Sequence, residues 1–429
     1  MPEHQFQAET LAIHAGQTPD AATGARALPI YQTTSFVFDS TEHAASLFNL
    51  QTFGNVYSRL SNPTVAALEE RVAALEGGRA ALASASGMAS EAMALMTILQ
   101  QGDHVVAAGA LYGGSVSMLA VNLARFGIET SFVDATQPEA FAAAMRPNTR
   151  AVFAESLGNP SLIMLDIAAV AEVAHAHGVP LVIDNTVPSP FLCNPLRLGA
   201  DIVVHSATKY LGGHGTTLAG VLVEGGKFPW DNGKFPGMTE PSKGYHGVRF
   251  YETFGDFGFT MRARMETLRV YGAALSPMSA WQILQGTETL HVRMERHCSN
   301  ALKVAEFLQN DPRISWVNYP GLPEHPQHAL VKKQMRQMDG VVGASGLLAF
   351  GVKGGLAAGV RFIEAAQFLS HLANIGDTRT LIIHPASTTH RQLDAEQQVA
   401  AGVLPDMVRM SVGIEHIDDI LWDIDQALG

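Results

Sequence analysis

One lysine, Lys209, follows a predicted strand in a segment whose residue types could do covalent chemistry. The apolar run 202–204 is followed by Ser206, Thr208, Lys209 and the glycine pair Gly212-Gly213. Burial among small and apolar groups disfavours an ammonium ion, which lowers the pKa of a lysine and makes its amine available as a nucleophile. Ser206 and Thr208 are two positions apart, so their hydroxyls could face one side and hold a phosphate. A surface lysine after a strand fits this segment alone equally well.

A carboxylate ends another apolar run, because Asp184 directly follows residues 181–183. In open α/β sheets, ligands bind beyond the carboxyl ends of the strands. A carboxylate in that position can hold a protonated ring nitrogen. Asp184 and Lys209 are 25 positions apart, and both fall at predicted strand ends. A turn or helix-capping role is the alternative for Asp184 alone.

Three loops could complete a ligand site. Gly87 and Met88 begin a predicted helix, and exposed amides at a helix start bind anions. Tyr112 precedes another helix and could stack on a flat ligand, and Asn159 follows a predicted strand. Packing and turn formation are the alternatives for these residues. The dinucleotide, P-loop, zinc-protease and serine-hydrolase motifs are missing from the sequence, which disfavours those classes.

Composition excludes several further classes. The chain has 429 residues, which is enough for a large core, and a formal charge of −12 makes it a poor partner for nucleic acid or anionic lipid. Cys193 and Cys298 form no disulfide framework or zinc spacing and suit a reducing compartment. Neither a signal-peptide core nor an apolar run near the ~18 residues of a membrane span occurs. We therefore expect a cytoplasmic globular protein.

Helical and strand-like patterns alternate along the first half of the chain. Helical periodicity covers 65–75, 88–100, 114–126, 138–145 and 166–177, and apolar runs occur at 104–108, 129–133, 151–154, 181–183, 202–204 and 219–223. This alternation predicts βαβ units and a mostly parallel sheet covered on both faces. We expect an arm (1–62), a ligand-binding domain (63–285) with an aromatic insertion near 227–264, and a smaller α+β domain (286–429).

Several motifs, in the same order along the chain, resemble the Cys/Met metabolism family of pyridoxal-phosphate (PLP) enzymes. They cover residues 57–64, 75–78, 86–88, 111–114, 206–214 and 408–415. The resemblance implies the α/β fold type I of aspartate aminotransferase-like enzymes. That fold has a mostly parallel central sheet with helices on both faces and a smaller α+β C-terminal domain.

Within the family, residues 23–26, 245–247 and 374–385 are most similar to the O-acetylhomoserine sulfhydrylase branch. This implies γ-replacement on O-acetyl-L-homoserine by sulfide, or by methanethiol, giving homocysteine or methionine together with acetate. A methionine γ-lyase and a cystathionine γ-synthase remain the alternatives. A non-catalytic binding protein with the same fold is disfavoured by the joint presence of Lys209, Asp184, Tyr112 and Arg409.

The resemblance also implies roles in binding the cofactor. Lys209 would carry PLP covalently, Asp184 would pair with its ring nitrogen, and Tyr112 would stack on the ring, so that these three are the expected catalytic residues. Asn159 would lie near the phenolic oxygen. The expected phosphate ligands are Gly87, Met88, Ser206 and Thr208, with Tyr57 and Arg59 supplied by a neighbouring subunit.

For the substrate, the resemblance implies that Arg409 binds the amino acid carboxylate and that Tyr57 also contributes. Asn374 stands where lyases and cystathionine synthases usually carry a serine beside this carboxylate, and Gly114 stands where methionine γ-lyases carry a cysteine. The resemblance further implies a homotetramer built from dimers with shared active sites. No metal is expected.

Overall fold

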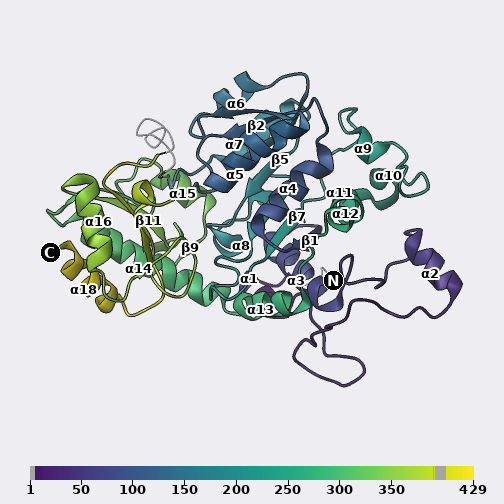
Figure 1. Ribbon diagram of the computed structural model, residues 1–429, viewed down its shortest axis with the longest axis horizontal. Helices are drawn as coiled ribbons and strands as arrows, with labels where there is room; N and C mark the ends of the chain where they lie inside the picture. The colour runs from purple at the N-terminus through teal and green to yellow at the C-terminus, as the bar shows by residue number, and fades with distance from the viewer. Residues whose placement is uncertain (1–4, 390, 392–401) are drawn as a thin grey trace.

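The computed structural model describes residues 5–389, 391 and 402–429, and its larger part is built on a seven-stranded sheet (Figure 1). The strand order is β1-β7-β6-β5-β4-β2-β3. The strands are β1 (Ala80–Ser84), β2 (His104–Ala108), β3 (Glu129–Val133), β4 (Thr149–Glu155), β5 (Leu181–Asp184), β6 (Ile202–Ser206) and β7 (Gly220–Glu224). Neighbouring strands from β3 to β6 pair in parallel, whereas β7 is antiparallel to β6 and to β1. The mostly parallel sheet is thus confirmed.

Helices cover this sheet, and most of its strand residues are buried. Every residue of β2, β5 and β7 is buried, as expected for a sheet covered on both faces. The helices of this region are α3 (Pro63–Glu76), α4 (Gly87–Ile98), α5 (Gly113–Ser117), α6 (Pro138–Ala144), α7 (Ile167–Ala176), α8 (Ser189–Leu192) and α13 (Pro277–Glu288). Helix α3 ends at Gly77, whose φ of 70° provides the left-handed cap that the sequence predicts.

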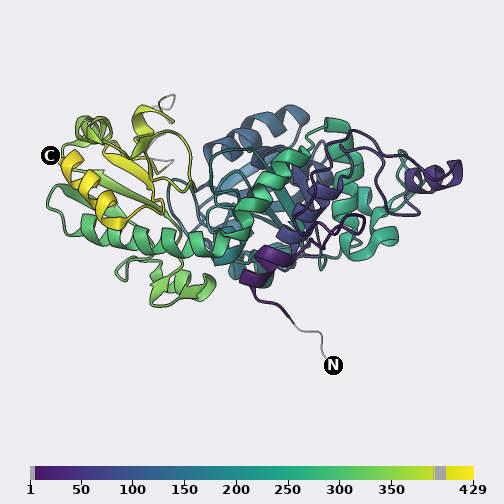
Figure 2. The same cartoon turned by 90° about the horizontal axis from the view of Figure 1, so that it is seen from below.

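A second sheet lies at the other end of the molecule, with strand order β12-β13-β14-β11-β8 (Figure 1). Its strands are β8 (Ile314–Asn318), β11 (Leu347–Val352), β12 (Ser370–His371), β13 (Leu381–Ile383) and β14 (Met407–Ser411), beside the hairpin β9 (Gln337–Met338) and β10 (Val341–Val342). The helices here are α14 (Leu290–Gln309), α15 (His328–Gln334), α16 (Gly355–Ala365) and α18 (Ile417–Leu428). Helix α14 contacts α1 and α8 as well as β8 and α18, so it joins the two parts of the molecule (Figure 2).

Residues 5–62 form two short helices, α1 (Ala8–His14) and α2 (Thr41–Phe48), joined by irregular chain. Figure 1 shows α2 projecting away from the body of the molecule. Val37 is 96% exposed and Phe53 is 73% exposed, although both side chains are apolar.

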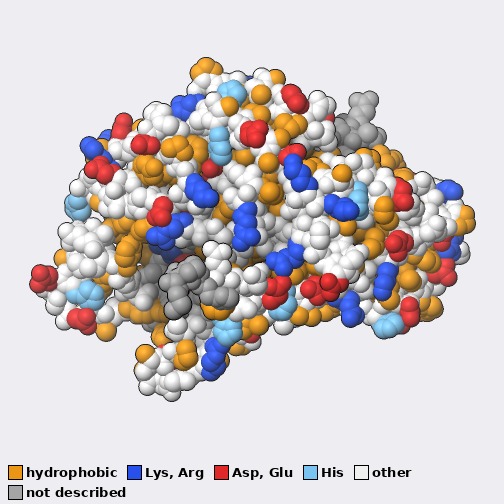
Figure 3. All heavy atoms as spheres, turned by 180° about the vertical axis from the view of Figure 1, so that it is seen from behind, with side chains coloured by type: hydrophobic (Ala, Val, Ile, Leu, Met, Phe, Trp, Pro, Cys, Tyr) orange, Lys and Arg blue, Asp and Glu red, His pale blue; other side chains and the backbone are white. Residues whose placement is uncertain are grey.

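Acidic and basic side chains are interspersed over the rear face of the molecule (Figure 3).

The aromatic segment near 227–264 is ordered and packed, as the sequence predicts. Trp230 stacks on Phe259 at 5.4 Å between ring centroids and meets Phe228 and Phe235 edge-on. Short helices follow at α9 (Pro236–Thr239), α10 (Phe250–Phe254), α11 (Gly258–Arg262) and α12 (Arg269–Tyr271).

Among the described helices, none combines the length and apolar character needed to cross a bilayer.

A buried polar network ties the strand ends of the larger sheet to α3. Glu76, which is fully buried at the end of α3, lies 2.7 Å from Nε2 of His205 on β6 and accepts a hydrogen bond from the amide of Asn185 (2.9 Å). The Asn185 side chain also donates to the carbonyl of Cys193 and accepts from the hydroxyl of Ser156. The network therefore fixes the end of β6 and the chain just beyond β4 and β5.

We expect Glu76→Ala to lower the free energy of unfolding by about 3–5 kcal/mol, because it leaves the buried ring of His205 without this partner and removes one acceptor of the Asn185 amide. Urea denaturation of the cofactor-free chain measures this change. Glu70→Ala, at an exposed position of the same helix, is the matched control and should change stability by less than about 0.5 kcal/mol. Equal denaturation midpoints for the two variants would contradict the importance of the network.

Candidate functional site

Lys209 lies in a tight turn three residues beyond β6, and its amine is largely buried. The Nζ atom donates a hydrogen bond to Oδ1 of Asn374. Desolvation, which is the larger cause, and the positive charge of Arg409 together lower the pKa of Lys209 to about 8. A substantial fraction of this amine is therefore neutral near physiological pH, as a nucleophile or base requires.

Arg293, on α14, holds the turn that follows Lys209. Its guanidinium is buried and donates to the carbonyls of Tyr210 (2.7 Å) and Gly286 (2.6 Å). The guanidinium can lie this close to the turn only because residue 213 is glycine. The φ of Gly213 is +73°, and a Cβ at this position would overlap the guanidinium. No sequence motif marks Arg293, because only the folded chain brings position 293 beside position 210.

Arg409, on β14, faces Lys209 from the smaller sheet. Its Nη1 donates to Oδ1 of Asn159 and its Nη2 donates to the carbonyl of Asn374, each at 3.1 Å. Its Nε is buried and has no hydrogen-bond partner among the described residues. Burial lowers the pKa of Arg409 to about 10, so it remains a cation at neutral pH. This cation with an unused donor suits a carboxylate ligand.

Asp184, at the end of β5, is buried, and its Oδ1 accepts a hydrogen bond from the amide of Thr186 (2.7 Å). The Thr186 hydroxyl accepts in turn from the amide of Ser206 (2.7 Å), so one residue ties together the ends of β5 and β6. Desolvation raises the pKa of Asp184, and the hydrogen bonds from Thr186 oppose that rise. A cationic partner beside Asp184 would favour its ionised form.

Glu155, at the end of β4, was also missed by the sequence analysis. It is the register partner of Asp184 in the β4–β5 pair, so both side chains lie on the same face of the sheet. Its carboxylate accepts from the backbone amide of Tyr112 and from that of Asn159 (3.0 Å). One buried group thus positions both of the loops that the sequence analysis had singled out.

The start of α4 meets the end of β6. The amides of Gly87 and Met88 are in the first turn of the helix, where no intrahelical acceptor is available. A Cβ on Gly87 would lie 2.6 Å from Cβ of Ser206, so glycine is required for this approach. The Thr208 hydroxyl accepts from the amide of Ala219 (3.0 Å) and donates to its carbonyl (3.2 Å), so it must redirect its proton to bind an anion.

The ring of Tyr112 is half exposed at the start of α5. A Cβ on Gly114 would lie 2.5 Å from Cε1 of this ring and 3.0 Å from the sulfur of Met88. A cysteine at position 114 would therefore push the Tyr112 ring aside. This contact explains why a glycine suits position 114.

Tyr57 and Arg59 are held elsewhere by their own chain. Arg59 donates to the carbonyl of Arg269, and its guanidinium lies 5.5 Å from the centroid of the Tyr57 ring. The contacts found among the described residues place neither of them beside Lys209 or Asp184 of this chain.

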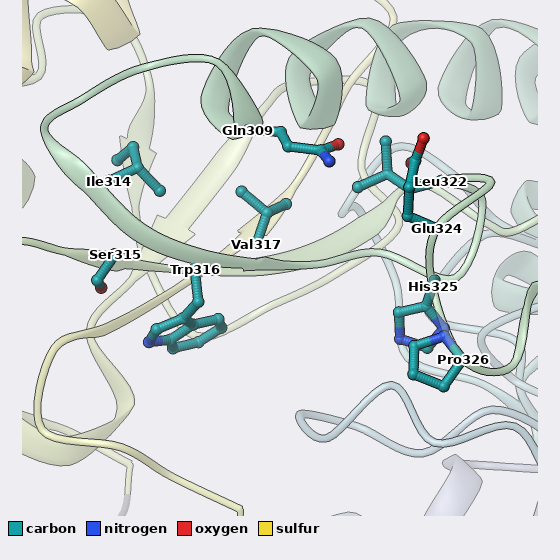
Figure 4. A pocket seen from close by; sticks show the side chains of 9 residues that line it. All are labelled: Gln309, Ile314, Ser315, Trp316, Val317, Leu322, Glu324, His325 and Pro326. Carbon is teal, nitrogen blue, oxygen red and sulfur yellow. The ribbon is translucent and has the colours of Figure 1, made fainter.

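A separate pocket lies on the smaller part of the molecule and shares no residue with this site (Figure 4). It is formed by the end of α14, by β8 and by the loop after it, and Figure 4 labels its lining residues: Gln309, Ile314, Ser315, Trp316, Val317, Leu322, Glu324, His325 and Pro326.

Comparison with known proteins identifies close relatives over the whole chain. The model of the family described as "Cys/Met metabolism PLP-dependent enzyme" matches residues 9–429. An O-acetyl-L-homoserine sulfhydrylase of Leptospira meyeri is 55% identical, with 100% of this chain and 98% of the relative covered. O-acetyl-L-homoserine sulfhydrylase 1 of Thermus thermophilus is 51% identical, with 98% and 99% covered, and homocysteine synthase of Schizosaccharomyces pombe is 48% identical, with 100% and 99% covered.

A solved structure also matches. It is that of a putative O-acetylhomoserine (thiol)-lyase from Campylobacter jejuni with N'-pyridoxyl-lysine-5'-monophosphate. The TM-score is 0.95 at 40% identity, covering 99% of this chain and 100% of that chain. This similarity agrees with the fold type I architecture that the sequence predicts.

The residues that the fold brings together fit PLP. An amine with a pKa lowered to about 8, a buried carboxylate and a half-exposed aromatic ring come from three neighbouring loops. The amides of Gly87 and Met88 are in the first turn of α4, where they have no acceptor within the helix, and this suits a phosphate. The donor set therefore matches the aldehyde, the ring nitrogen and the phosphate of this cofactor.

In the cofactor-free protein, we expect the Lys209 amine to react with an acylating reagent along a pH profile centred near 8, because only the neutral amine is nucleophilic. Peptide mass spectrometry locates and quantifies the labelling. Arg409→Gln should move the midpoint of the profile to higher pH, since it removes a positive charge that disfavours the ammonium form. An unchanged midpoint in this variant would contradict the assigned electrostatics.

Proposed function

Because the chain belongs to the Cys/Met metabolism family of PLP-dependent enzymes, we propose that it catalyses γ-replacement on O-acetyl-L-homoserine. The bond between Cγ and the acetate oxygen would break first, and sulfide would then form the new bond to Cγ, giving L-homocysteine and acetate. The observation that carries the proposal is the buried Lys209 amine with a pKa of about 8, opposite the cationic Arg409. The names of the relatives support this choice of substrate.

Lys209 is proposed to carry the cofactor and to move protons. When bound, PLP supplies an electron sink beside the α-carbon of an amino acid. The Lys209 amine would take the proton from Cα of the substrate and then serve as base and acid at Cβ. A pKa near 8 suits both roles at neutral pH, and a positioned group of this kind contributes about 10²- to 10⁴-fold.

Three residues are proposed to hold the cofactor ring. The Asp184 carboxylate would keep the ring nitrogen protonated, the Tyr112 ring would stack on the cofactor, and the Asn159 amide would lie near the phenolic oxygen. Glu155 supports this arrangement, because it anchors the backbone of Tyr112 and of Asn159.

The phosphate is proposed to lie at the start of α4. The amides of Gly87 and Met88 and the hydroxyls of Ser206 and Thr208 would bind it there. The close approach of Gly87 to Ser206 supports this role, because it brings the first turn of α4 beside the end of β6.

The substrate carboxylate is proposed to bind to Arg409. The unpaired Nε of Arg409 supports this assignment. Asn374 is proposed to line the same subsite, because its carbonyl holds Nη2 of Arg409 and its side chain accepts from Lys209. A carboxylate bound there would lie beside the amine that moves the protons.

We also propose that the active site is shared between subunits. Residues 1–62 would act as an arm that brings Tyr57 and Arg59 to the phosphate, and Tyr57 to the substrate, of a neighbouring subunit in a homotetramer of dimers. A neighbouring subunit would cover the exposed apolar side chains of Val37 and Phe53. Residues 63–285 and 286–429 would form the two domains of each subunit.

We also propose a reducing, cytoplasmic location. The free, buried Cys193 and Cys298 support this location.

The relatives reported above do not favour the γ-lyase and cystathionine γ-synthase alternatives.

We expect the purified enzyme to release homocysteine and acetate in equal amounts only when sulfide is present. We expect Lys209→Ala to lose at least about 10³-fold in turnover. Chromatographic product analysis with sulfide, methanethiol or cysteine checks both points. A 2-oxoacid formed without an added thiol would indicate the lyase, and cystathionine as the main product would indicate the synthase.

Sharing of active sites predicts complementation. Lys209→Ala and Arg59→Ala should each be weakly active alone, whereas subunits mixed by unfolding and refolding should regain activity, because one hybrid site then has both native residues. Steady-state assays before and after mixing measure this, and light scattering reports the oligomer. A mixture no more active than the mean of its parents would show that Arg59 serves its own subunit.

A further inference from the structure

A third buried carboxyl group, Glu91, lies beside Asp184 and has no part in the function proposed above. It is on α4, one turn beyond Gly87, and its side chain is only 3% exposed. Its neighbours are the carboxylates of Asp184 and Glu155 and the hydroxyl of Ser115 on α5. Its Oε2 is completely buried and has no hydrogen-bond donor among the described residues.

The three carboxyl groups cannot all be ionised. Two ionised carboxylates have no hydrogen to share, so the contact between Glu91 and Asp184 is favourable only when one of them has a proton. Desolvation is the largest of the causes that raise the pKa of Glu91 well above its usual value, and the charges of Asp184 and Glu155 and the contact with the Asp184 carboxylate act in the same direction. The Ser115 hydroxyl opposes this rise.

The hydrogen bonds identify which group has the proton. Glu155 accepts from the amides of Tyr112 and Asn159, and Asp184 accepts from the amide of Thr186. These donors stabilise the anions of Glu155 and Asp184, and His205 adds a favourable charge toward Asp184 when protonated. Glu91 has no backbone donor of this kind among the described residues, so its anion is the least stabilised of the three.

We propose that Glu91 is a neutral carboxylic acid that donates its proton to Asp184 and thereby acts as a positioning residue for the ion pair between Asp184 and the cofactor ring nitrogen. The inference rests on the proposed pairing of Asp184 with that nitrogen. A donor to the Asp184 anion stabilises the charged pair, carboxylate and pyridinium, over the neutral pair, carboxylic acid and pyridine. Glu91 thus helps to keep the ring an electron sink without touching the substrate.

The first test uses the cofactor-free chain. We expect its infrared spectrum to contain the carbonyl band of a buried protonated carboxylic acid at neutral pH, and Glu91→Gln to remove it in the difference spectrum. Glu224→Gln is the matched control: burial raises the pKa of Glu224 to about 7, and this carboxyl group accepts from the amides of Phe259 and Thr260, so at a pH above 7 this variant should lose a carboxylate band instead. A difference spectrum that shows loss of a carboxylate band from Glu91 would overturn the proposal.

The second test uses the loaded enzyme with PLP labelled with ¹⁵N in its ring. Glu91→Gln keeps a neutral donor, so the ring-nitrogen chemical shift should stay at the wild-type, protonated position and turnover should stay within about 3-fold. Glu91→Leu removes the donor, so the shift should move toward that of neutral pyridine and turnover should fall by about 10- to 100-fold, as expected for a lost hydrogen bond to a charged group.

The outcomes separate this inference from the proposed function. An unchanged ring-nitrogen shift in Glu91→Leu, or a Glu91→Gln enzyme as impaired as Glu91→Leu, would overturn the role of Glu91 and leave the proposed function intact. A wild-type ring nitrogen that is not protonated would instead contradict the proposed role of Asp184. Infrared spectra of the cofactor-free protein remain decisive for the proton on Glu91 in either case.

Discussion

Holding the amine of Lys209 out of water, beside the guanidinium of Arg409, is the constraint on which the rest of the structure depends. Either cation alone would be costly to bury, and each makes the other less favourable. Lys209 responds with a pKa of about 8, whereas Arg409 keeps its proton and is held by Asn159 and Asn374. The protein thus places a base with a pKa of about 8 next to a fixed cation, which is the pair that an amino acid substrate with a carboxylate and an acidic Cα–H requires.

The strand ends supply the opposite charge. The parallel register of β4 and β5 puts Glu155 and Asp184 side by side, and α4 brings Glu91 against them. Such a cluster is unfavourable unless protons or a cation compensate its charge. Hydrogen bonds from backbone amides favour the anions of Glu155 and Asp184, although desolvation raises the pKa of both groups. In the proposed function, a protonated cofactor ring would complete the balance of charge, so the same residues would both position the cofactor and set its electronic state.

Sequence patterns predicted much of this structure, because the signals were local. The runs at 104–108 and 129–133 are strands β2 and β3 without any shift of their bounds, and α3 ends at Gly77 as its periodicity indicates. Strand β1 was missed, because its sequence, Ala-Ala-Leu-Ala-Ser, lacks the β-branched and aromatic residues typical of strands. Lys209, Asp184, Asn159 and Arg409 were singled out from motifs, and the fold brings them to one site. Glu91, Glu155 and Arg293 carry no such signal, since their importance comes from contacts distant in sequence or from burial.

The central claim is that one amine, that of Lys209, bonds covalently to PLP, and reductive trapping tests it most directly. The loaded enzyme is treated with borohydride and digested, and its peptides are analysed by mass spectrometry. The account predicts a stoichiometric phosphopyridoxyl group on the peptide that contains Lys209. Its presence on any other side chain, or its absence from the protein, would contradict the account.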